Sequence, residues 1–356
     1  VYPSATHTRF THSLGVMYLS TQMCESLGVS SNIKKINQIA GLLHDIGHLP
    51  FSHTLEKILN DRTGLTHEDI SCEYIDKLEK RDSVTFPVEP SSVKSVIKSE
   101  TNVINTIAND IDADRLDYLV RDSYYTGINF GKIELDTLLK FAQIIDGKIG
   151  FDYKSLNSVE RVLDARMQMN YSVYAHDTVI ITESMLRRAV EKYLDSTNTA
   201  ILDLVGKDDS ELQYDLLNSD VQESIDLFNA IQNRNLYKVC YNEPLREITK
   251  EDMESISSVF SEPQIHEKRI ADMCGLSSTE VIISPPKPPS EDELDIPIEV
   301  SKRKVVPISE ISSKPDSLRE SSMLQENLLV FSPEPHREIV SEAASTYIHT
   351  LDNVSM

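Results

Sequence analysis

Residues 41–53, Gly-Leu-Leu-His-Asp-Ile-Gly-His-Leu-Pro-Phe-Ser-His, place three histidines and one aspartate within ten positions. The residues just before them, 36–43, are mostly apolar with helical spacing, and the glycine and proline that follow stop a helix. We therefore expect His44 and Asp45 at a helix end, where two adjacent side chains can turn toward one ion. In mid-helix they would point about 100° apart. Imidazole and carboxylate together suit a divalent transition metal.

A metal ion needs more than two protein ligands, and two other stretches supply candidates. The upstream stretch Thr-Arg-Phe-Thr-His-Ser-Leu-Gly contains His12, and the downstream stretch Ile-Asp-Ala-Asp-Arg-Leu-Asp-Tyr contains Asp114. Asp112 is the nearest rival to Asp114, and Asp110 is a weaker one. A single such residue is more often a satisfied polar group at a helix end, but four of them in this order favour a metal site.

The order His12, then His44 and Asp45, then Asp114 resembles the H…HD…D signature of the HD-domain metal-dependent phosphohydrolases. The segments Arg-Phe-Thr-His-Ser-Leu-Gly-Val, Gly-Leu-Leu-His-Asp-Ile-Gly-His-Leu-Pro-Phe-Ser-His, Thr-His-Glu and Asp-Ala-Asp-Arg-Leu-Asp-Tyr-Leu-Val-Arg-Asp follow one another. In that order they are similar to the deoxynucleoside triphosphate (dNTP) triphosphohydrolase branch, which includes the dGTPases and the SAM- and HD-domain dNTPase. The resemblance favours Asp114 over Asp112. The four ligands suit Mn, Fe, Co or Zn, with Mg also open.

The resemblance implies a mainly α fold, an HD-domain helical fold with a small α+β C-terminal region. We expect the HD domain over residues 1–240, with its N-terminal part missing because the chain begins at Val1, and the α+β region over 241–356 with a Pro-rich segment at 285–323. Helices are predicted at 12–28, 33–46, 51–60, 66–80, 91–109, 114–122, 158–195, 208–236 and 334–350, a mixed segment at 135–145, and strands at 147–153, 280–284, 296–300, 304–308 and 328–331.

Composition limits the function classes. The net charge of −22 disfavours nucleic-acid binding through bulk attraction. No apolar run approaches the roughly 18 residues of a membrane span, and no signal segment opens the chain. Four scattered cysteines without a CxxC pair fit a reducing compartment, so we expect a cytoplasmic protein without membrane association.

Histidines are the candidates for proton transfer. Phosphoester cleavage needs an activated water and a protonated leaving oxygen, and a metal ion can supply the first and a histidine the second. The resemblance makes His48, His53 and His67 pocket residues, with His53 at the position usually assigned to proton transfer. We expect Glu68, which follows His67, to orient it. His48 and His67 could instead orient a metal ligand.

Substrate contacts are predicted on two helices and at one helix start. Residues 114, 118 and 122 share one helix face, and so do 166, 170 and 174. The resemblance implies that Arg115 and Arg166 contact phosphate, that Tyr118 and Asp122 reach the sugar, and that Tyr174 packs beside it. Arg9 is a further phosphate candidate. Asn170 stands where some family members have histidine, which leaves its contact in doubt.

Two hypotheses follow for the function. The first is a metal-dependent enzyme that hydrolyses a dNTP to deoxynucleoside and inorganic triphosphate, with other HD chemistry (a nucleotide phosphatase or phosphodiesterase) as an alternative. The second is a non-catalytic nucleotide sensor that keeps the fold. By resemblance we also expect a homo-oligomer; the preferred dNTP, the metal and any allosteric control stay open.

Overall fold

The computed structural model describes residues 1–100, 103–244, 259, 261–285, 296–302, 304–323 and 327–352. It divides into two compact units, each built from two separate pieces of chain. The first comprises Val1–Tyr174 with Ser290–Leu318, and the second Ala175–Pro289 with Arg319–Met356. The expected boundary at residue 240 follows the order of the chain rather than this grouping by contact, and it stays a prediction.

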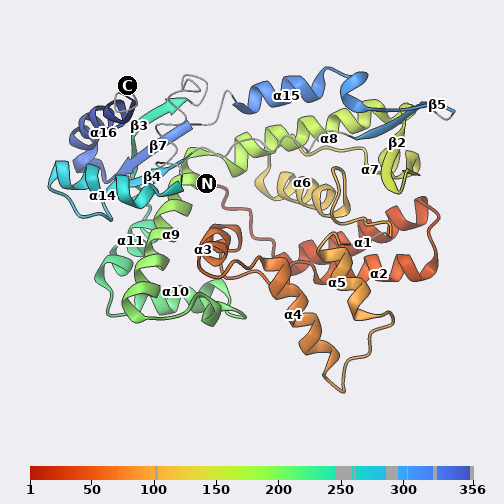
Figure 1. The fold of residues 1–356 in the computed structure, drawn as a ribbon, viewed down its shortest axis with the longest axis horizontal. Coiled ribbons are helices and arrows are strands. Elements are labelled where there is room, and N and C mark those ends of the chain that lie inside the picture. The colour runs from red at the N-terminus through yellow and green to blue at the C-terminus, as the bar shows by residue number, and fades with distance from the viewer. Residues whose placement is uncertain are drawn as a thin grey trace. The chain divides into compact units, whose positions relative to one another are not determined.

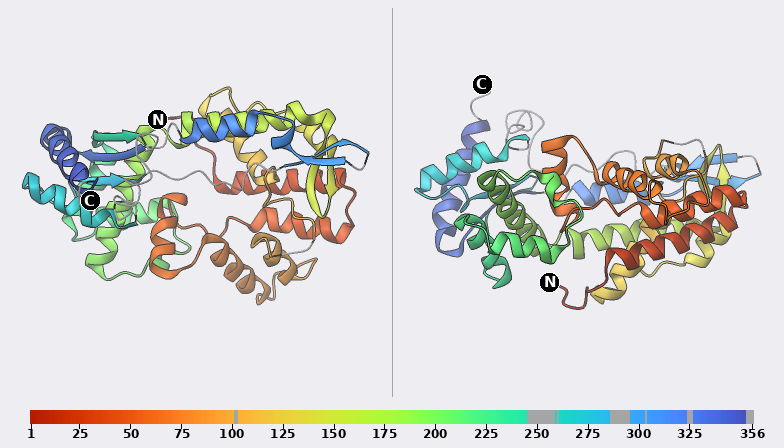
Figure 2. Two further views of the ribbon diagram at one scale, coloured as in Figure 1. Left: turned by 45° about the horizontal axis from the view of Figure 1, so that its top comes forward. Right: turned by 90° about the horizontal axis from the view of Figure 1, so that it is seen from below.

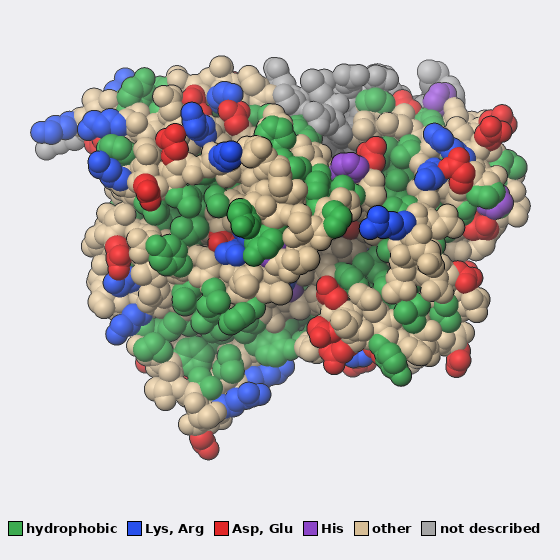
Figure 3. Space-filling view, turned by 180° about the vertical axis from the view of Figure 1, so that it is seen from behind, with side chains coloured by type: hydrophobic (Ala, Val, Ile, Leu, Met, Phe, Trp, Pro, Cys, Tyr) green, Lys and Arg blue, Asp and Glu red, His purple; other side chains and the backbone are tan. Residues whose placement is uncertain are grey.

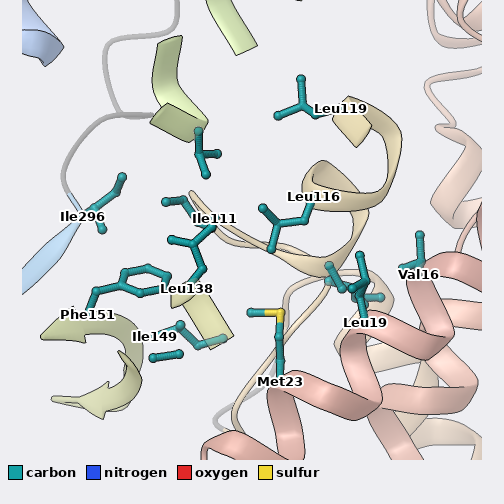
Figure 4. Close-up of a cluster of buried hydrophobic side chains, with 14 of the residues drawn as sticks. Val16, Leu19, Met23, Ile111, Leu116, Leu119, Leu138, Ile149, Phe151 and Ile296 are labelled. Atoms are coloured by element: carbon teal, nitrogen blue, oxygen red, sulfur yellow. The ribbon is translucent and has the colours of Figure 1, made fainter. Parts of the chain in front are cut away.

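Helices make up most of the first unit (Figure 1). They are α1 (Arg9–Ser26), α2 (Ser31–Leu43), α3 (His53–Thr63), α4 (His67–Glu79), α5 (Pro90–Ile97), α6 (Ala113–Thr126), α7 (Leu135–Phe141) and α8 (Leu156–Met169), followed by a π-helical turn, η2 (Asn170–Tyr174). The core lies between α1, α6 and the sheet of this unit. Figure 4 shows Val16, Leu19 and Met23 of α1 facing the same cluster as Leu116 and Phe151.

A four-stranded sheet completes the first unit. Strands β1 (Ala142–Ile145) and β2 (Lys148–Asp152) form an antiparallel hairpin. Strand β5 (Pro297–Ser301) pairs in parallel with β2, and β6 (Lys304–Pro307) pairs antiparallel with β5. The chain therefore returns to this sheet after passing through the second unit (Figure 2).

The second unit packs helices on a three-stranded antiparallel sheet of order β3-β7-β4. Its strands are β3 (Lys238–Pro244), β4 (Ile282–Ser284) and β7 (Asn327–Ser332), and its helices are α9 (Asp177–Thr197), α10 (Asp209–Leu217), α11 (Gln222–Gln232), α14 (Pro263–Cys274) and α16 (Arg337–Asp352). Helix α15 (Lys314–Met323) crosses the division between the units. One core of this unit joins β4 and β7 to α14 and α16.

The mainly α prediction is confirmed, and most expected elements are present. The helix expected over 91–109 is wrong beyond Ile97, where α5 ends. The single helix expected over 158–195 is also wrong, because the π-helical turn and a break separate α8 from α9. Strand β3 and helices α14 and α15 were not predicted. No helix in the described part of the chain is long and apolar enough to cross a bilayer.

One face of the molecule carries charges of both signs. On the face drawn in Figure 3, lysine and arginine side chains are scattered among acidic ones and form no continuous stripe. Such a surface gives no basic track for a nucleic-acid backbone on this face.

Candidate metal centre and active site

Helix α1 places His12 in its second turn. Thr8 caps the helix through a capping box with Thr11, so that the helix begins at Arg9. Nε2 of His12 lies 2.9 Å from Oδ1 of Asp114 and 3.9 Å from Oδ2 of Asp45. The start of α1 thus brings one imidazole to two carboxylates that come from distant parts of the sequence.

His44 and Asp45 lie at the C-terminal end of α2, as predicted. The helix ends at Leu43, and His44 is its C-cap residue. Nδ1 of His44 donates to the carbonyl of Gly41 at 2.9 Å, which turns Nε2 toward Asp45 Oδ1 at 3.3 Å and Asp114 Oδ1 at 3.7 Å. This Nε2 is buried and has no hydrogen-bond partner. A buried nitrogen lone pair left without a donor is suited to a metal ion.

Three of the four predicted metal ligands meet at one place, and the fourth, Asp45, lies beside them. One ligand atom each from His12, His44 and Asp114 lie within 4.8 Å of one another. Asp45 borders the same cluster and forms an ion pair at 2.6 Å with Nη1 of Arg9. Two imidazoles and two carboxylates can therefore hold a divalent metal, whose identity this donor set does not select.

The electrostatics of the cluster favour a bound cation. Burial raises the pKa of Asp45 and Asp114, but hydrogen bonds and charges from neighbouring histidines outweigh it and hold both pKa values below the usual range. Burial lowers the pKa of His12, yet Asp114 and Asp117 raise it to about 9. Two buried carboxylates that remain ionised provide the negative charge that a divalent ion neutralises.

A second group of three histidines borders the cluster. The rings of His48 and His67 stack with centroids 3.9 Å apart, and His53 lies 4.9 Å from His48. His53 begins α3 directly after Phe51 and Ser52, whose φ angles of 54° and 48° are left-handed and strained for such residues. His48 Nε2 lies 3.4 Å from Asp45 Oδ1, so Asp45 connects the two groups.

Helix α6 continues from the metal cluster into a polar wall. Tyr118 and Asp122 follow Asp114 at one-turn intervals, and the hydroxyl of Tyr174 donates to Asp122 Oδ2 at 2.7 Å. The rings of Tyr118 and Tyr174 meet edge to face at 6.1 Å. His7, which the sequence did not single out, pairs with Asp122 Oδ1 at 2.8 Å. The wall thus presents phenol groups and a carboxylate one and two helical turns along α6 from the metal cluster.

Comparison with known proteins shows what this arrangement belongs to. Residues 9–122 match the model of the HD domain, and residues 133–354 match that of the HD associated region. An uncharacterized protein of Methanocaldococcus jannaschii is 32% identical over 94% of this chain and 70% of its own length. This chain belongs to the HD-domain phosphohydrolase family.

Two further matches extend the comparison. A phosphohydrolase from Bacteroides thetaiotaomicron has a solved structure of TM-score 0.71, with 26% identity over 94% of this HD-domain chain and 89% of that one. A deoxynucleoside triphosphate triphosphohydrolase homolog of Dictyostelium discoideum is 29% identical over 67% of this chain. The chain spans about half of the Dictyostelium protein, 52% of its length.

The three predicted phosphate-binding arginines lie beside residues of the metal cluster or of the polar wall. Arg9 forms its ion pair with Asp45 and also donates from Nε to the hydroxyl of Ser52. Arg115 and Arg166 lie close enough to Tyr118 for their charges to lower its pKa, although burial is the larger effect and raises that pKa to about 12. Asn170 is exposed at the start of the π-helical turn.

Sequence reasoning missed Glu56. Its Oε1 accepts hydrogen bonds from the backbone N–H of His67 at 2.9 Å and from Nδ1 of the same residue at 3.0 Å. Glu68, which we expected to orient His67, lies 3.5 Å from Nε2 and makes the weaker contact. Glu56 stands three residues after His53 on α3, and this spacing on one helix face was the available signal.

Asp117 was the other residue missed at the metal centre. Its Oδ2 lies 2.7 Å from Nδ1 of His12, on the side of the ring opposite Asp114. Asp114 and Asp117 are three residues apart on α6, so one helix contacts both nitrogens of the same imidazole. The i, i+3 spacing was visible in the sequence, but the partner of Asp117 was not.

Proposed function

We propose that this HD-domain protein is a metal-dependent hydrolase of dNTPs, which releases deoxynucleoside and inorganic triphosphate. The observation that carries the proposal is the layout of α6. It supplies Asp114 to the metal cluster, Arg115 beside it, and Tyr118 and Asp122 one and two turns further on. A nucleotide with its phosphates at the cluster would have its sugar at this wall. The name of the Dictyostelium relative supports a dNTP as the substrate class.

His12, His44, Asp45 and Asp114 would hold the ion, as the orphaned Nε2 of His44 and the ionised carboxylates indicate. When bound, the ion would act as a Lewis acid on the phosphate under attack. In this arrangement Arg9, which otherwise neutralises Asp45, becomes free to contact a phosphate oxygen. A guanidinium suits that contact because its donors form a planar fork.

His67 is the better proton donor of the histidine group. Burial lowers its pKa, but the hydrogen bond to Glu56 and the charges of Glu68 and Asp45 raise it above the usual value. His53 has the opposite environment, since burial, His48 and Arg9 lower its pKa to about 4. A histidine whose pKa is raised is the better suited to donate a proton to the leaving 5′ oxygen, whereas His53, with its lowered pKa, is suited to accept one.

The sugar would contact Tyr118, Asp122 and Tyr174. Asp122 accepts from Tyr174 and pairs with His7, so its carboxylate is held in place before a substrate arrives. Preorganised acceptors of this kind lower the entropic cost of binding a hydroxyl group.

The experiment that tests the proposal measures inorganic triphosphate release from each of the four dNTPs and from GTP, with Mn²⁺ or Fe²⁺. His44→Ala and Asp114→Ala should abolish release, and Asp61→Asn, an exposed residue of α3, serves as the control. Release of orthophosphate or pyrophosphate instead would assign another HD chemistry. Nucleotide binding without turnover would favour a sensor.

A further inference from the structure

We propose that Asp117 is a positioning residue that fixes the ring orientation and tautomer of His12 for metal binding, and that Gly15 is the residue that makes room for it. This inference rests on the metal site of the proposed function, but it is independent of the substrate.

The contacts of Asp117 define the orientation. Its carboxylate is buried, with 8% of the side chain exposed, and Oδ2 lies in hydrogen-bond contact with Nδ1 of His12 at 2.7 Å. When Nδ1 keeps the ring proton and donates a hydrogen bond to Asp117, the lone pair of Nε2 faces the cluster with Asp114 and His44. A metal-binding histidine needs this tautomer, and a carboxylate on the other ring nitrogen is the usual way to select it.

Arg121 holds the carboxylate in turn. It donates from Nε to Oδ2 at 2.8 Å and from Nη2 to Oδ1 at 2.9 Å. This two-point contact, one helical turn further along α6, fixes the plane of the Asp117 carboxylate as well as its position. A series of hydrogen bonds thus runs from Arg121 through Asp117 to the imidazole of His12.

Gly15 explains how the side chains of Asp117 and Arg121 fit against α1. A Cβ atom built on Gly15 would lie closer than 3.0 Å to the Asp117 carboxylate and to Nη2 of Arg121. The conflicting atoms are ends of side chains, so an alanine here would displace the carboxylate rather than separate the helices. Glycine in a helix interior is otherwise unfavourable compared with alanine, which makes its presence three residues after His12 informative.

A purely structural ion pair between Asp117 and Arg121 is the competing explanation. It predicts that substitutions change the thermal stability and leave metal affinity unaltered. A positioning role predicts instead that metal affinity falls by more than any change in thermal stability explains.

The test measures Zn²⁺ affinity of the full chain by competition with a chromophoric chelator, together with the Co²⁺ absorption spectrum and the thermal midpoint. Asp117→Asn should weaken Zn²⁺ binding by about 10- to 100-fold, the range for such partners of metal-bound histidine. Gly15→Ala should weaken it in the same direction, by more than any accompanying change in the thermal midpoint accounts for. Both should alter the Co²⁺ spectrum, which reports ligand geometry.

Asp61→Asn is the matched control, because it also removes the carboxylate of an i, i+4 ion pair, here with Lys57 on α3. Wild-type Zn²⁺ affinity in Asp117→Asn would overturn the inference, and wild-type affinity in Gly15→Ala would overturn the role of the glycine. His12→Ala separates the two levels of proposal. If it loses Zn²⁺ while Asp117→Asn does not, the metal site stands and only the positioning role fails; if it binds normally, the metal site itself is wrong.

Discussion

Glu56 and His67 are the residue pair on which the proton chemistry of the site depends. The carboxylate of Glu56 accepts hydrogen bonds from the backbone N–H and from Nδ1 of His67. It therefore both fixes the position of the ring and stabilises the charged form of the ring. Because these two effects come from one group, a single isosteric substitution can separate charge from shape.

Glu56→Gln should therefore shift the pH profile of triphosphate release. Loss of the carboxylate lowers the pKa of His67 from its raised value. Activity that requires protonated His67 falls as the pH rises through that pKa, so the basic limb of the kcat profile should move to lower pH. Glu68→Gln, which removes the weaker contact at 3.5 Å, should move it less. An unchanged basic limb in Glu56→Gln would show that His67 is not the donor.

Gly47 is a second residue whose size matters. A Cβ here would come closer than 3.0 Å to the carbonyl of His67 and to the backbone nitrogen of Ser71. Unlike the conflict at Gly15, this one is with backbone, so the loop after His44 and the start of α4 would have to separate. Ser71 already connects them, since it accepts from the Gly47 N–H and donates to the carbonyl of His44.

Gly47→Ala should lower the free energy of unfolding by about 1–3 kcal/mol, the usual cost of overpacking, and reduce activity further by displacing His67. Ser71→Ala removes the same bridge without adding bulk, and it should retain more activity. Urea unfolding and triphosphate release measure the two effects. Equal activity in both variants would mean that the bridge, not the close approach, positions α4.

The residues missed by sequence reasoning have a common cause. Glu56, Asp117 and His7 act through partners from other elements, and helical spacing shows only which residues share a face. His12, His44 and Asp114, which the structure brings together, could be predicted as a set because a metal site demands several ligands of defined chemistry. Their order in the chain could therefore be recognised without any knowledge of the contacts.

At the scale of the element, α6 illustrates how one helix start decides the site. Asp112 is its N-cap and accepts from the backbone N–H of Arg115 at 2.7 Å and of Asn109 at 2.9 Å. Its carboxylate is occupied by the cap, while Asp114 faces the cluster. The sequence could not separate these two aspartates by chemistry alone.

Asp112→Ala should lower the free energy of unfolding by about 1 kcal/mol, as expected for a lost N-cap. Asp112→Asn should retain the cap bond from the N–H of Arg115, because the amide oxygen also accepts there, and should lose the second bond, from the N–H of Asn109. Zn²⁺ affinity of the folded Asp112→Asn variant should equal that of the wild type. A loss comparable with that of Asp114→Ala would instead make Asp112 a ligand.

Element boundaries were predictable where a local signal ends a helix. Gly28 follows the end of α1, and Gly127 caps α6 with a φ of 77°. The failure over 91–109 has a different origin. Asn37 of α2 donates from Nδ2 to the carbonyl of Ile104 at 2.8 Å and accepts from the N–H of Thr106 at 2.9 Å, and these contacts hold the segment before α6 outside a helix. Tertiary contacts of this kind override the apolar periodicity from which the longer helix was inferred.

At the scale of the whole molecule, the order of the strands along the chain does not show which strands pair. β2 pairs in parallel with β5 across about 145 residues of sequence, with Phe151 opposite Ile298. Apolar alternation predicts that each segment is a strand, but it contains no information on the partner. Self-association and a cytoplasmic location likewise stay predictions.

A buried ion pair in the second unit allows the independence of the two units to be tested. Arg188 and Glu267, both almost fully buried in the second unit, form an ion pair at 2.5 Å, and Glu267 also accepts from the N–H of Ile283. The removal of one member of a buried pair leaves the other charge uncompensated, which costs about 3 kcal/mol or more.

Glu267→Gln should accordingly destabilise the second unit by that order in urea unfolding, followed by circular dichroism. All predicted metal ligands belong to the first unit, which has its own core, so Zn²⁺ affinity before the transition should remain that of the wild type. Lys57→Gln, which breaks an exposed pair, should change neither quantity measurably. A parallel loss of Zn²⁺ binding in Glu267→Gln would mean that the first unit depends on the second for its fold.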